Sequence, residues 1–233
     1  MWAGLFSFGQ RFPDAGLILE IYVLYYVPMT RSIAASDRRY RGRPREFDMD
    51  KVLDAAILVF RERGYNATSI ADLRDATGLT AGSLYKAFKD KRGIFVAALD
   101  RYVASRDEAL SRHLREARTG RDKVLAMIRS YAEVSHGIEG RRGCMVLGGL
   151  TDIDTFDEAL AKRFRRALVR VERKLVAFIE EGMHDASLPA DLDAPSSARH
   201  LLCVMEGLRV LGKRGSHARD MDAVVEQAMR ALA

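Results

Sequence analysis

The residues whose chemistry could support catalysis or metal binding are scattered and form no recognisable site. Asp152, Asp154 and Asp157 are spaced like calcium ligands, but the glycine and the distal glutamate of a calcium loop are missing. These aspartates are better suited to begin a helix, and Asp154 is predicted to be the N-cap of the longest one. The segment 207–213 has the spacing of a phosphate-binding loop, but Arg214 stands where a serine or threonine would hold magnesium.

No nucleophile with a neighbouring base and no cluster of metal ligands emerges elsewhere in the sequence. We therefore predict no catalytic residues and no enzyme activity. We also predict no metal site and no cofactor.

The two cysteines, Cys144 and Cys203, are too few for a disulfide framework. Cys144 follows Arg141 and Arg142, and neighbouring cations favour the reactive thiolate form of a cysteine. One hypothesis is therefore that Cys144 senses electrophiles or oxidants; the other is that it is an inert buried thiol. Cys203 lies in a helical apolar pattern and is expected in the core.

Positive charge is concentrated in one short segment. The chain has 233 residues and a formal charge of +6, and six arginines lie within residues 31–45 against the single acidic Asp37. The same segment contains Gly42 and Pro44, which favour a flexible arm over a helix. Such an arm can follow a DNA backbone or enter a minor groove; a solvated tail is the alternative.

After the arm, apolar residues recur with a helical period almost throughout, and no convincing strand period occurs. We therefore predict an all-α fold. Ser69 and Thr80 are positioned to begin two short helices, and Gly78 lies between them, where a tight turn is needed. Two short helices joined in this way have the dimensions of a helix-turn-helix, whose second helix enters the DNA major groove.

Residues 42–95 extend this match, because the string GRPREFD…AAILVFRERGYNATSIADL…TGLTAGSLYKAFKDKRGIF resembles the TetR family of transcriptional regulators. The specific elements are Phe60, Gly64 and Tyr65 at the end of the first helix, together with Leu84-Tyr85, Phe88 and Lys91. The resemblance implies an N-terminal helix-turn-helix DNA-binding domain and a C-terminal helical ligand-binding and dimerisation domain. With the basic arm, it implies these DNA-binding residues: Arg43, Arg45, Thr68, Ser69, Thr80, Ala81, Gly82, Ser83, Tyr85, Lys86 and Lys91. Among them, Thr68, Ser69 and Lys91 would hold backbone phosphates.

Beyond residue 95 the resemblance is one of pattern. It implies a small-molecule cavity between the C-terminal helices and a dimer seam formed by the last two, with Leu201, Met205, Leu208, Val224, Val225, Ala228 and Leu232. Candidate ligand-binding residues are Tyr131, His136, Cys144, Met145, Phe164, Phe178 and Met205. For each of them, plain core packing is the alternative.

The first residues form a separate feature. The apolar run 15–28 is too short to span a bilayer and contains Glu20; a signal peptide or an extension ahead of a true start at Met29 are the other interpretations. We predict an extension over 1–36, a basic arm over 37–45, a DNA-binding domain over 46–95 and a ligand-binding and dimerisation domain over 96–233.

Together these features predict a cytoplasmic, ligand-responsive transcriptional regulator that is not attached to a membrane. It would act as a homodimeric repressor on a palindromic operator in double-stranded DNA, and a small-molecule effector or a reactive species would release it. One alternative is a helical small-molecule-binding or enzyme domain with a degenerate helix-turn-helix. Another is a membrane-tethered regulator that uses residues 15–28.

Overall fold

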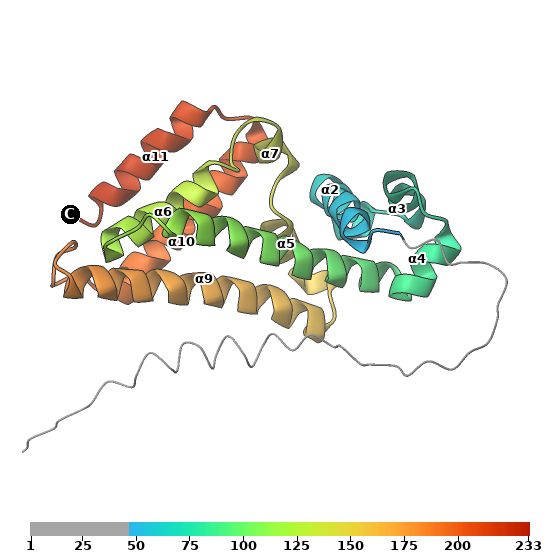
Figure 1. The fold of residues 1–233 in the computed structure, drawn as a ribbon, viewed down its shortest axis with the longest axis horizontal. Coiled ribbons are helices and arrows are strands. Elements are labelled where there is room, and N and C mark those ends of the chain that lie inside the picture. Colours follow the sequence, from blue (N-terminus) through green and yellow to red (C-terminus); the bar gives the residue numbers. More distant parts are fainter. Residues whose placement is uncertain (1–46) are drawn as a thin grey trace, which may run out of the picture. The chain divides into compact units, whose positions relative to one another are not determined.

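The described part of the chain, residues 47–233 of a computed structural model, is built from helices alone, which confirms the all-α prediction (Figure 1). Arg43, Arg45 and the predicted N-terminal extension lie outside the described residues. The helices are α2 (Met49–Ala67), α3 (Ile70–Thr77), α4 (Ala81–Phe88), α5 (Lys91–Leu114), α6 (Gly120–Ala132), α7 (Gly137–Arg142), α8 (Met145–Thr151), the 3-10 turn η1 (Ile153–Thr155), α9 (Glu158–His184), α10 (Ala194–Arg214) and α11 (Ala218–Arg230).

Polar side chains at the predicted positions begin the helices of the N-terminal half. Ser69 and Asp72 form a capping box at the start of α3, and the Thr80 hydroxyl accepts from the Ser83 N–H at the start of α4. Asp90 accepts from the Gly93 N–H at the start of α5. Each cap satisfies a backbone donor that the first helical turn leaves free, so the helix boundaries follow from local sequence.

Two boundaries differ from the sequence-based prediction. The three glycines of residues 137–143 predict a loop, but residues 137–142 form the short helix α7. The longest helix, α9, begins after Asp157 and not after Asp154, which lies in the η1 turn. Asp157 accepts from the Leu160 N–H and also receives two hydrogen bonds from Arg92, at 2.6 and 2.8 Å. The hydrogen bonds from Arg92 lower the pKa of the Asp157 carboxyl to about 2, so it stays ionised at the helix N-terminus, where negative charge is favoured.

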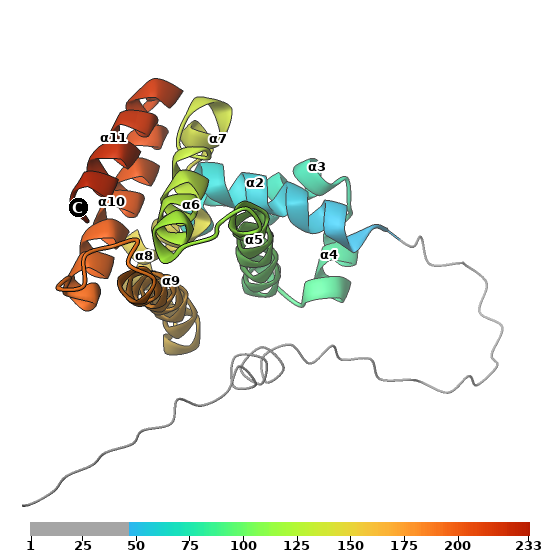
Figure 2. The same cartoon turned by 60° about the vertical axis from the view of Figure 1, so that its left-hand side comes forward.

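The core consists of two hydrophobic clusters, and α5 and α9 contribute to both. The head cluster lies among α2, α3, α4, α8, the N-terminal part of α9 and residues 94–102 of α5. The body cluster lies among α6, α9, α10 and α11 and includes Leu110 near the end of α5. Figures 1 and 2 show α5 running from the α2–α4 end of the described helices toward α6 and α10.

The last two helices bury residues that the sequence assigned to a dimer seam. Leu201, Met205 and Leu208 are at most 1% exposed, and Val225, Ala228 and Leu232 belong to the same body cluster. These side chains hold α10 and α11 to α6 and α9 of their own chain, so their assignment to the seam is wrong. The outward face of α10 carries other residues instead, among them Cys203, which is exposed and not in the core as predicted.

Helices α6 and α9 touch at a glycine contact. A Cβ atom on Gly120 would lie 2.0 Å from the Gly182 backbone nitrogen and 2.5 Å from the Phe178 carbonyl oxygen. Only a residue without a side chain permits two backbones to come this close. None of the helices within residues 47–233 is long and apolar enough to cross a bilayer.

Candidate nucleic-acid interface and ligand cavity

Helices α3 and α4 have the geometry of a helix-turn-helix. Gly78 ends α3 in the left-handed region, with φ 69° and ψ 11°, and its N–H donates to the Arg74 carbonyl at 2.8 Å. Leu73 and Leu84 are fully buried in the head cluster, so they fix the two helices against α2 and α5. This packing leaves the opposite side of α4 facing solvent.

The solvent-facing side of α4 carries small or hydrogen-bonding residues, as the sequence predicted. Gly82, Tyr85 and Lys86 are exposed, and Tyr85 is 45% exposed despite its size. Ala81 and Ser83 are half-buried. A Cβ on Gly82 would meet only the Thr80 hydroxyl, at 3.9 Å, so the backbone here is open to close approach. Such a surface fits a helix whose N-terminal residues enter a major groove.

Two residues assigned to phosphate contacts, Thr68 and Lys91, form hydrogen bonds to backbone carbonyls within the fold. Thr68 is 2% exposed, and its hydroxyl donates to the Gly64 carbonyl at 2.6 Å. The Lys91 ammonium donates to the carbonyls of Tyr65 and Thr68, both at 2.9 Å, and lies 4.5 Å from the centre of the Tyr65 ring. These contacts close the C-terminal end of α2, because the positive φ of Gly64 leaves carbonyls there without helical partners. Ser69, by contrast, is exposed.

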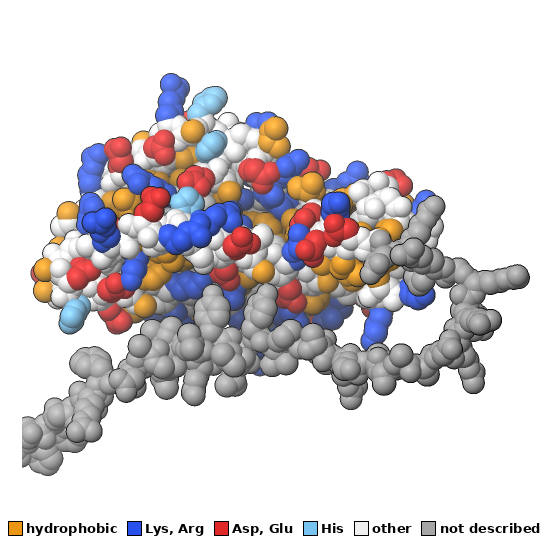
Figure 3. Space-filling model, in the orientation of Figure 1, with side chains coloured by type: hydrophobic (Ala, Val, Ile, Leu, Met, Phe, Trp, Pro, Cys, Tyr) orange, Lys and Arg blue, Asp and Glu red, His pale blue; other side chains and the backbone are white. Residues whose placement is uncertain are grey.

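Charges of both signs are mixed over the described surface. Figure 3 shows basic and acidic side chains interspersed along the face in view. Many of them pair, for example Arg63 with Asp72 at 2.5 Å and Arg101 with Asp54 at 2.6 Å. This mixture of charges agrees with a nearly neutral surface over the described residues, in contrast to the arginine-rich segment 31–45 of the sequence.

A cavity of about 70 Å³ lies among α5, α6, α8, α9 and α10. Its walls are mainly apolar, with Val103, Leu110 and Met127 among them, and a few polar groups converge on it. Mainly apolar walls with a small number of placed polar groups are typical of small-molecule sites. Of the seven candidate ligand-binding residues, Tyr131 and Cys144 line this cavity.

The other five candidates lie elsewhere in the fold. Met145 and Phe164 belong to the head cluster, where the Phe164 ring stacks on Phe156 with centroids 5.4 Å apart. Met205 and Phe178 pack in the body cluster. His136 is half-buried and immediately precedes α7. The periodic pattern identified these positions as inward-facing, but core packing, not the cavity, accounts for four of them.

The cavity also contains polar residues that the sequence pattern did not indicate. Tyr102 donates from its hydroxyl to the Cys144 sulfur at 3.6 Å. Burial raises the pKa of the Tyr102 and Tyr131 phenols, so both remain protonated donors at neutral pH. Burial also raises the pKa of the Glu206 carboxyl, while the positive charge of Arg209 opposes that shift.

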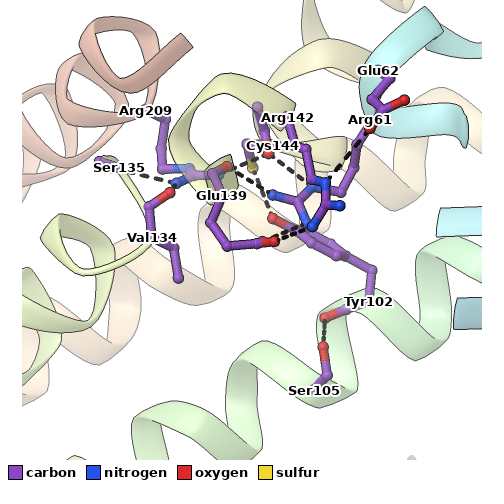
Figure 4. A network of polar contacts seen from close by, with 11 residues as sticks. Arg61, Glu62, Tyr102, Ser105, Val134, Ser135, Glu139, Arg142, Cys144 and Arg209 are labelled. Atoms are coloured by element: carbon purple, nitrogen blue, oxygen red, sulfur yellow. Dashed lines mark hydrogen bonds and ion pairs between the residues drawn. The ribbon is translucent and has the colours of Figure 1, made fainter. Parts of the chain in front are cut away.

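One backbone carbonyl beside the cavity accepts hydrogen bonds from two buried arginines, Arg61 and Arg209 (Figure 4). The Gly143 carbonyl accepts from Arg61 Nε at 2.9 Å and from Arg209 Nη2 at 2.7 Å. Arg61 belongs to α2 and also donates to the side chain and the carbonyl of Glu139, at 2.9 and 3.0 Å. Arg209 belongs to α10, lines the cavity and donates to the Val134 carbonyl.

The sequence carries a signal for both arginines in the helical period. Arg61 follows Ile57 by four residues, and Arg209 follows Met205 by four, so each lies on the inward stripe of its helix. Both are buried, at 9% and 2% exposed. A buried charge needs several hydrogen bonds, so a charged residue in an apolar stripe indicates a structural polar network.

Comparison with known proteins agrees with this geometry. The family described as "Bacterial regulatory proteins, tetR family" matches residues 52–98, and the family described as "Tetracyclin repressor-like, C-terminal domain" matches residues 120–232. The HTH-type transcriptional repressor ComR of Escherichia coli K12 is 28% identical over 197 residues, which cover 83% of this chain and 92% of ComR. The repressor BdcR of the same organism is 30% identical over 135 residues, which cover 58% of this chain and 68% of BdcR.

A solved structure is similar along the same length. The complex of a cysteine mutant of the TetR family regulator CifR with a 26-base-pair double-strand operator gives a TM-score of 0.73 at 32% identity, covering 82% of this chain and 100% of that chain. The two family matches together cover the helix-turn-helix and, of the helices that enclose the cavity, α6, α8, α9 and α10. The chain therefore belongs to the TetR family and is a DNA-binding transcriptional regulator.

Proposed function

We propose that the protein is a homodimeric repressor that binds a palindromic operator in the cytoplasm. It leaves the operator when a small molecule enters the cavity among α5, α6, α8, α9 and α10. It acts by binding alone and catalyses no reaction. The observation that carries the proposal is the presence, in one chain, of an open α4 surface and a separate, mainly apolar cavity. An effector that binds one of two dimer conformations more tightly shifts the population away from the operator-binding form.

The direct test is fluorescence anisotropy with the DNA upstream of the protein's own gene, followed by a thermal-shift screen of small molecules. We expect sequence-specific binding that competing random DNA does not abolish, and at least one stabilising compound that also lowers operator affinity. A helical binding or enzyme domain with a degenerate helix-turn-helix would show no specific binding to any DNA.

The division of labour along the chain is part of the proposal. Residues 46–95, which supply α2, α3, α4 and the start of α5 to the head cluster, are assigned to a DNA-binding domain. Residues 96–233, which contain the body cluster and line the cavity, are assigned to a ligand-binding and dimerisation domain. Within the first domain, the proposed base and backbone contacts are Ser69, Thr80, Ala81, Gly82, Ser83, Tyr85 and Lys86. Tyr131 and Cys144 are the proposed ligand contacts.

The dimer seam is proposed for the outward faces of α10 and α11. On α10 this face carries Cys203 and Val210, the latter 59% exposed. Gly207 lies between them with nothing within 4 Å of a Cβ, so a partner helix can approach closely. Two helices from each subunit would then form the seam, and the symmetric pair would place two α4 helices on two half-sites.

The basic arm is proposed to contact phosphates. Deleting residues 29–45 is expected to weaken binding to operator and to random DNA alike, because phosphate contacts carry no sequence information. The log–log salt slope should become shallower by roughly 0.9 for each phosphate that the arm no longer neutralises. Anisotropy titrations at several salt concentrations measure both effects, and an unchanged slope would exclude the arm from the interface.

Cys144 is proposed as the site at which reactive species act. Cys144 lines the cavity, and its sulfur accepts a hydrogen bond from the Tyr102 hydroxyl at 3.6 Å. We expect Cys144→Ser to bind operator like the parent but to lose release by thiol-reactive electrophiles. Cys203→Ser tests the other thiol: Cys203 does not line the cavity, so release by electrophiles should persist. Its dimeric state is measured first, because Cys203 lies on the proposed seam. If Cys144→Ser is still released, the inert-thiol interpretation is correct.

A further inference from the structure

We propose that Arg209 couples the cavity to the DNA-binding helices, acting through the Gly143 carbonyl that it shares with Arg61. This regulatory role rests on the proposed function and adds to it the residue that transmits the state of the cavity. In this role Arg209 is a positioning residue, because it touches no DNA.

The first step is the contact between Arg209 and the cavity. Arg209 is 2% exposed and lines the cavity together with Glu206. Its Nη1 donates to the Val134 carbonyl and its Nη2 to the Gly143 carbonyl at 2.7 Å. Among residues 47–233, no acceptor bonds its buried Nε, and none donates to the buried Oε2 of Glu206. A ligand with an acceptor and a donor would satisfy these two atoms, because unpaired buried polar groups are costly.

The second step is the connector, which we define as residues 137–144. It comprises α7, Gly143 and Cys144. Figure 4 shows Arg209 and Arg61 approaching the connector from α10 and α2 respectively. The connector packs closely on α10, because a Cβ on Gly140 would lie 3.1 Å from the Gly212 carbonyl oxygen. A shift of the Arg209 guanidinium therefore acts directly on the backbone that Arg61 holds.

The third step is the DNA-binding head. Arg61 fixes α2 to the connector through three hydrogen bonds, to Gly143 and to Glu139. Its guanidinium also lies 5.6 Å from the centre of the Tyr102 ring on α5. Both helices pack against the helix-turn-helix in the head cluster. The carbonyl of Gly143 thus joins Arg209, which lines the cavity, to Arg61, which positions α2 beside the helix-turn-helix.

Charged side chains of both signs surround the connector, and the Lys213 ammonium also lies beside Gly143. Arg61, Arg142 and Arg209 face Glu62, Glu139 and Glu206: Arg61 pairs with Glu139 at 2.9 Å, Arg142 with Glu139 at 2.6 Å and with Glu62 at 3.5 Å. Glu206 is close enough to Arg209 for the arginine to affect its pKa. Arg142, Glu62 and Glu139 are partly exposed, so these groups can exchange partners without leaving an unpaired charge fully buried.

The test compares Arg209→Met with the parent dimer on operator and on random DNA. We expect operator affinity to fall at least about fivefold, the lower end of typical allosteric coupling, because loosely held heads must be ordered before both engage their half-sites. Random-DNA affinity should stay within about twofold, since no phosphate-binding charge has changed. A purely structural role would lower both affinities together with thermal stability, and that result overturns the proposal.

Four further variants sharpen the test. Arg106→Met is the matched control: Arg106 also lines the cavity and donates to a backbone carbonyl, that of Ser130 at 2.7 Å, but does not reach Gly143. Arg209→Lys keeps the charge and serves if Arg209→Met does not fold. Its operator affinity should also fall, because an ammonium lacks the rigid planar donor fork with which Arg209 holds the Val134 and Gly143 carbonyls. Arg61→Met combined with Arg209→Met should bind operator within about twofold of Arg61→Met alone, as expected for residues acting in series.

The outcomes separate the two levels of the hypothesis. A parent protein that binds no operator overturns the proposed function. A parent that binds, together with an Arg209→Met protein that binds equally well, overturns the coupling and leaves the proposed function intact. An Arg106→Met protein with the same operator-specific loss also overturns the coupling, because the effect would then belong to the cavity wall in general.

Discussion

Replacing Gly82 with leucine is expected to abolish operator binding while leaving the fold intact. A side chain at this position faces open space beside Thr80, so the free protein can accept it. Within a helix, replacing glycine also stabilises by about 0.5–1 kcal/mol. On DNA, the same side chain would stand between α4 and the floor of the groove. If each subunit loses about 1.4 kcal/mol, the dimer loses affinity about 100-fold.

Anisotropy for operator affinity and thermal denaturation for stability are the two measurements. The control is Gly148→Leu, because Gly148 is also a helical glycine with nothing within 4 Å of a Cβ, but it lies in α8. It should bind operator like the parent. Wild-type operator affinity in Gly82→Leu would show that α4 does not enter the groove by this face.

Replacing Gly120 with alanine is expected to have the opposite pattern, a large loss of stability that is independent of DNA. The added Cβ would lie 2.0 Å from the Gly182 nitrogen, and backbone cannot move aside as a flexible side chain does. Overpacking usually lowers the free energy of unfolding by about 1–3 kcal/mol, and this clash belongs at the upper end. At about 3 kcal/mol, the melting temperature of a chain of this size should fall by roughly 6–12 °C.

Urea denaturation and calorimetry measure this effect. Gly148→Ala is the matched control, since the same substitution in open space should leave stability unchanged or slightly raise it. If Gly120→Ala melts like the parent, helices α6 and α9 are farther apart in solution than this contact requires.

The parts of the fold that local sequence predicted are those with local causes. Ser69, Thr80 and Asp90 begin their helices by bonding N–H groups only three residues away. The left-handed turn at Gly78 likewise depends on that residue alone. For this reason the helix-turn-helix and its exposed α4 surface could be predicted before any three-dimensional information.

The parts that could not be predicted depend on contacts between distant segments. Residues 137–143 contain three glycines and predict a loop, but Gly140 packs tightly on the Ser135 backbone and near the Gly212 carbonyl, and this packing holds α7 in place. Likewise, the pattern showed that Phe164 faces inward, but not which cluster it would join. Helical periodicity gives the inward side of a helix, not its neighbours.

Thr68 and Lys91 illustrate a third limit. Residue type suggested that a hydroxyl and an ammonium near the helix-turn-helix would bind phosphates. In the fold, both complete the end of α2, where Gly64 interrupts the helix and frees carbonyl oxygens. A backbone carbonyl without a helical partner accepts a hydrogen bond from a nearby polar side chain, and that side chain is then engaged within the fold.

Helix α5 has a mechanical consequence that follows from its length. Its 24 residues extend about 36 Å at 1.5 Å per residue, and they belong to the head cluster at one end and the body cluster at the other. A tilt of about 5° about the body end would carry the head end about 3 Å, close to the spacing of neighbouring base pairs. A helix of this length can therefore convert a small adjustment at the body end into a much larger displacement at the head end.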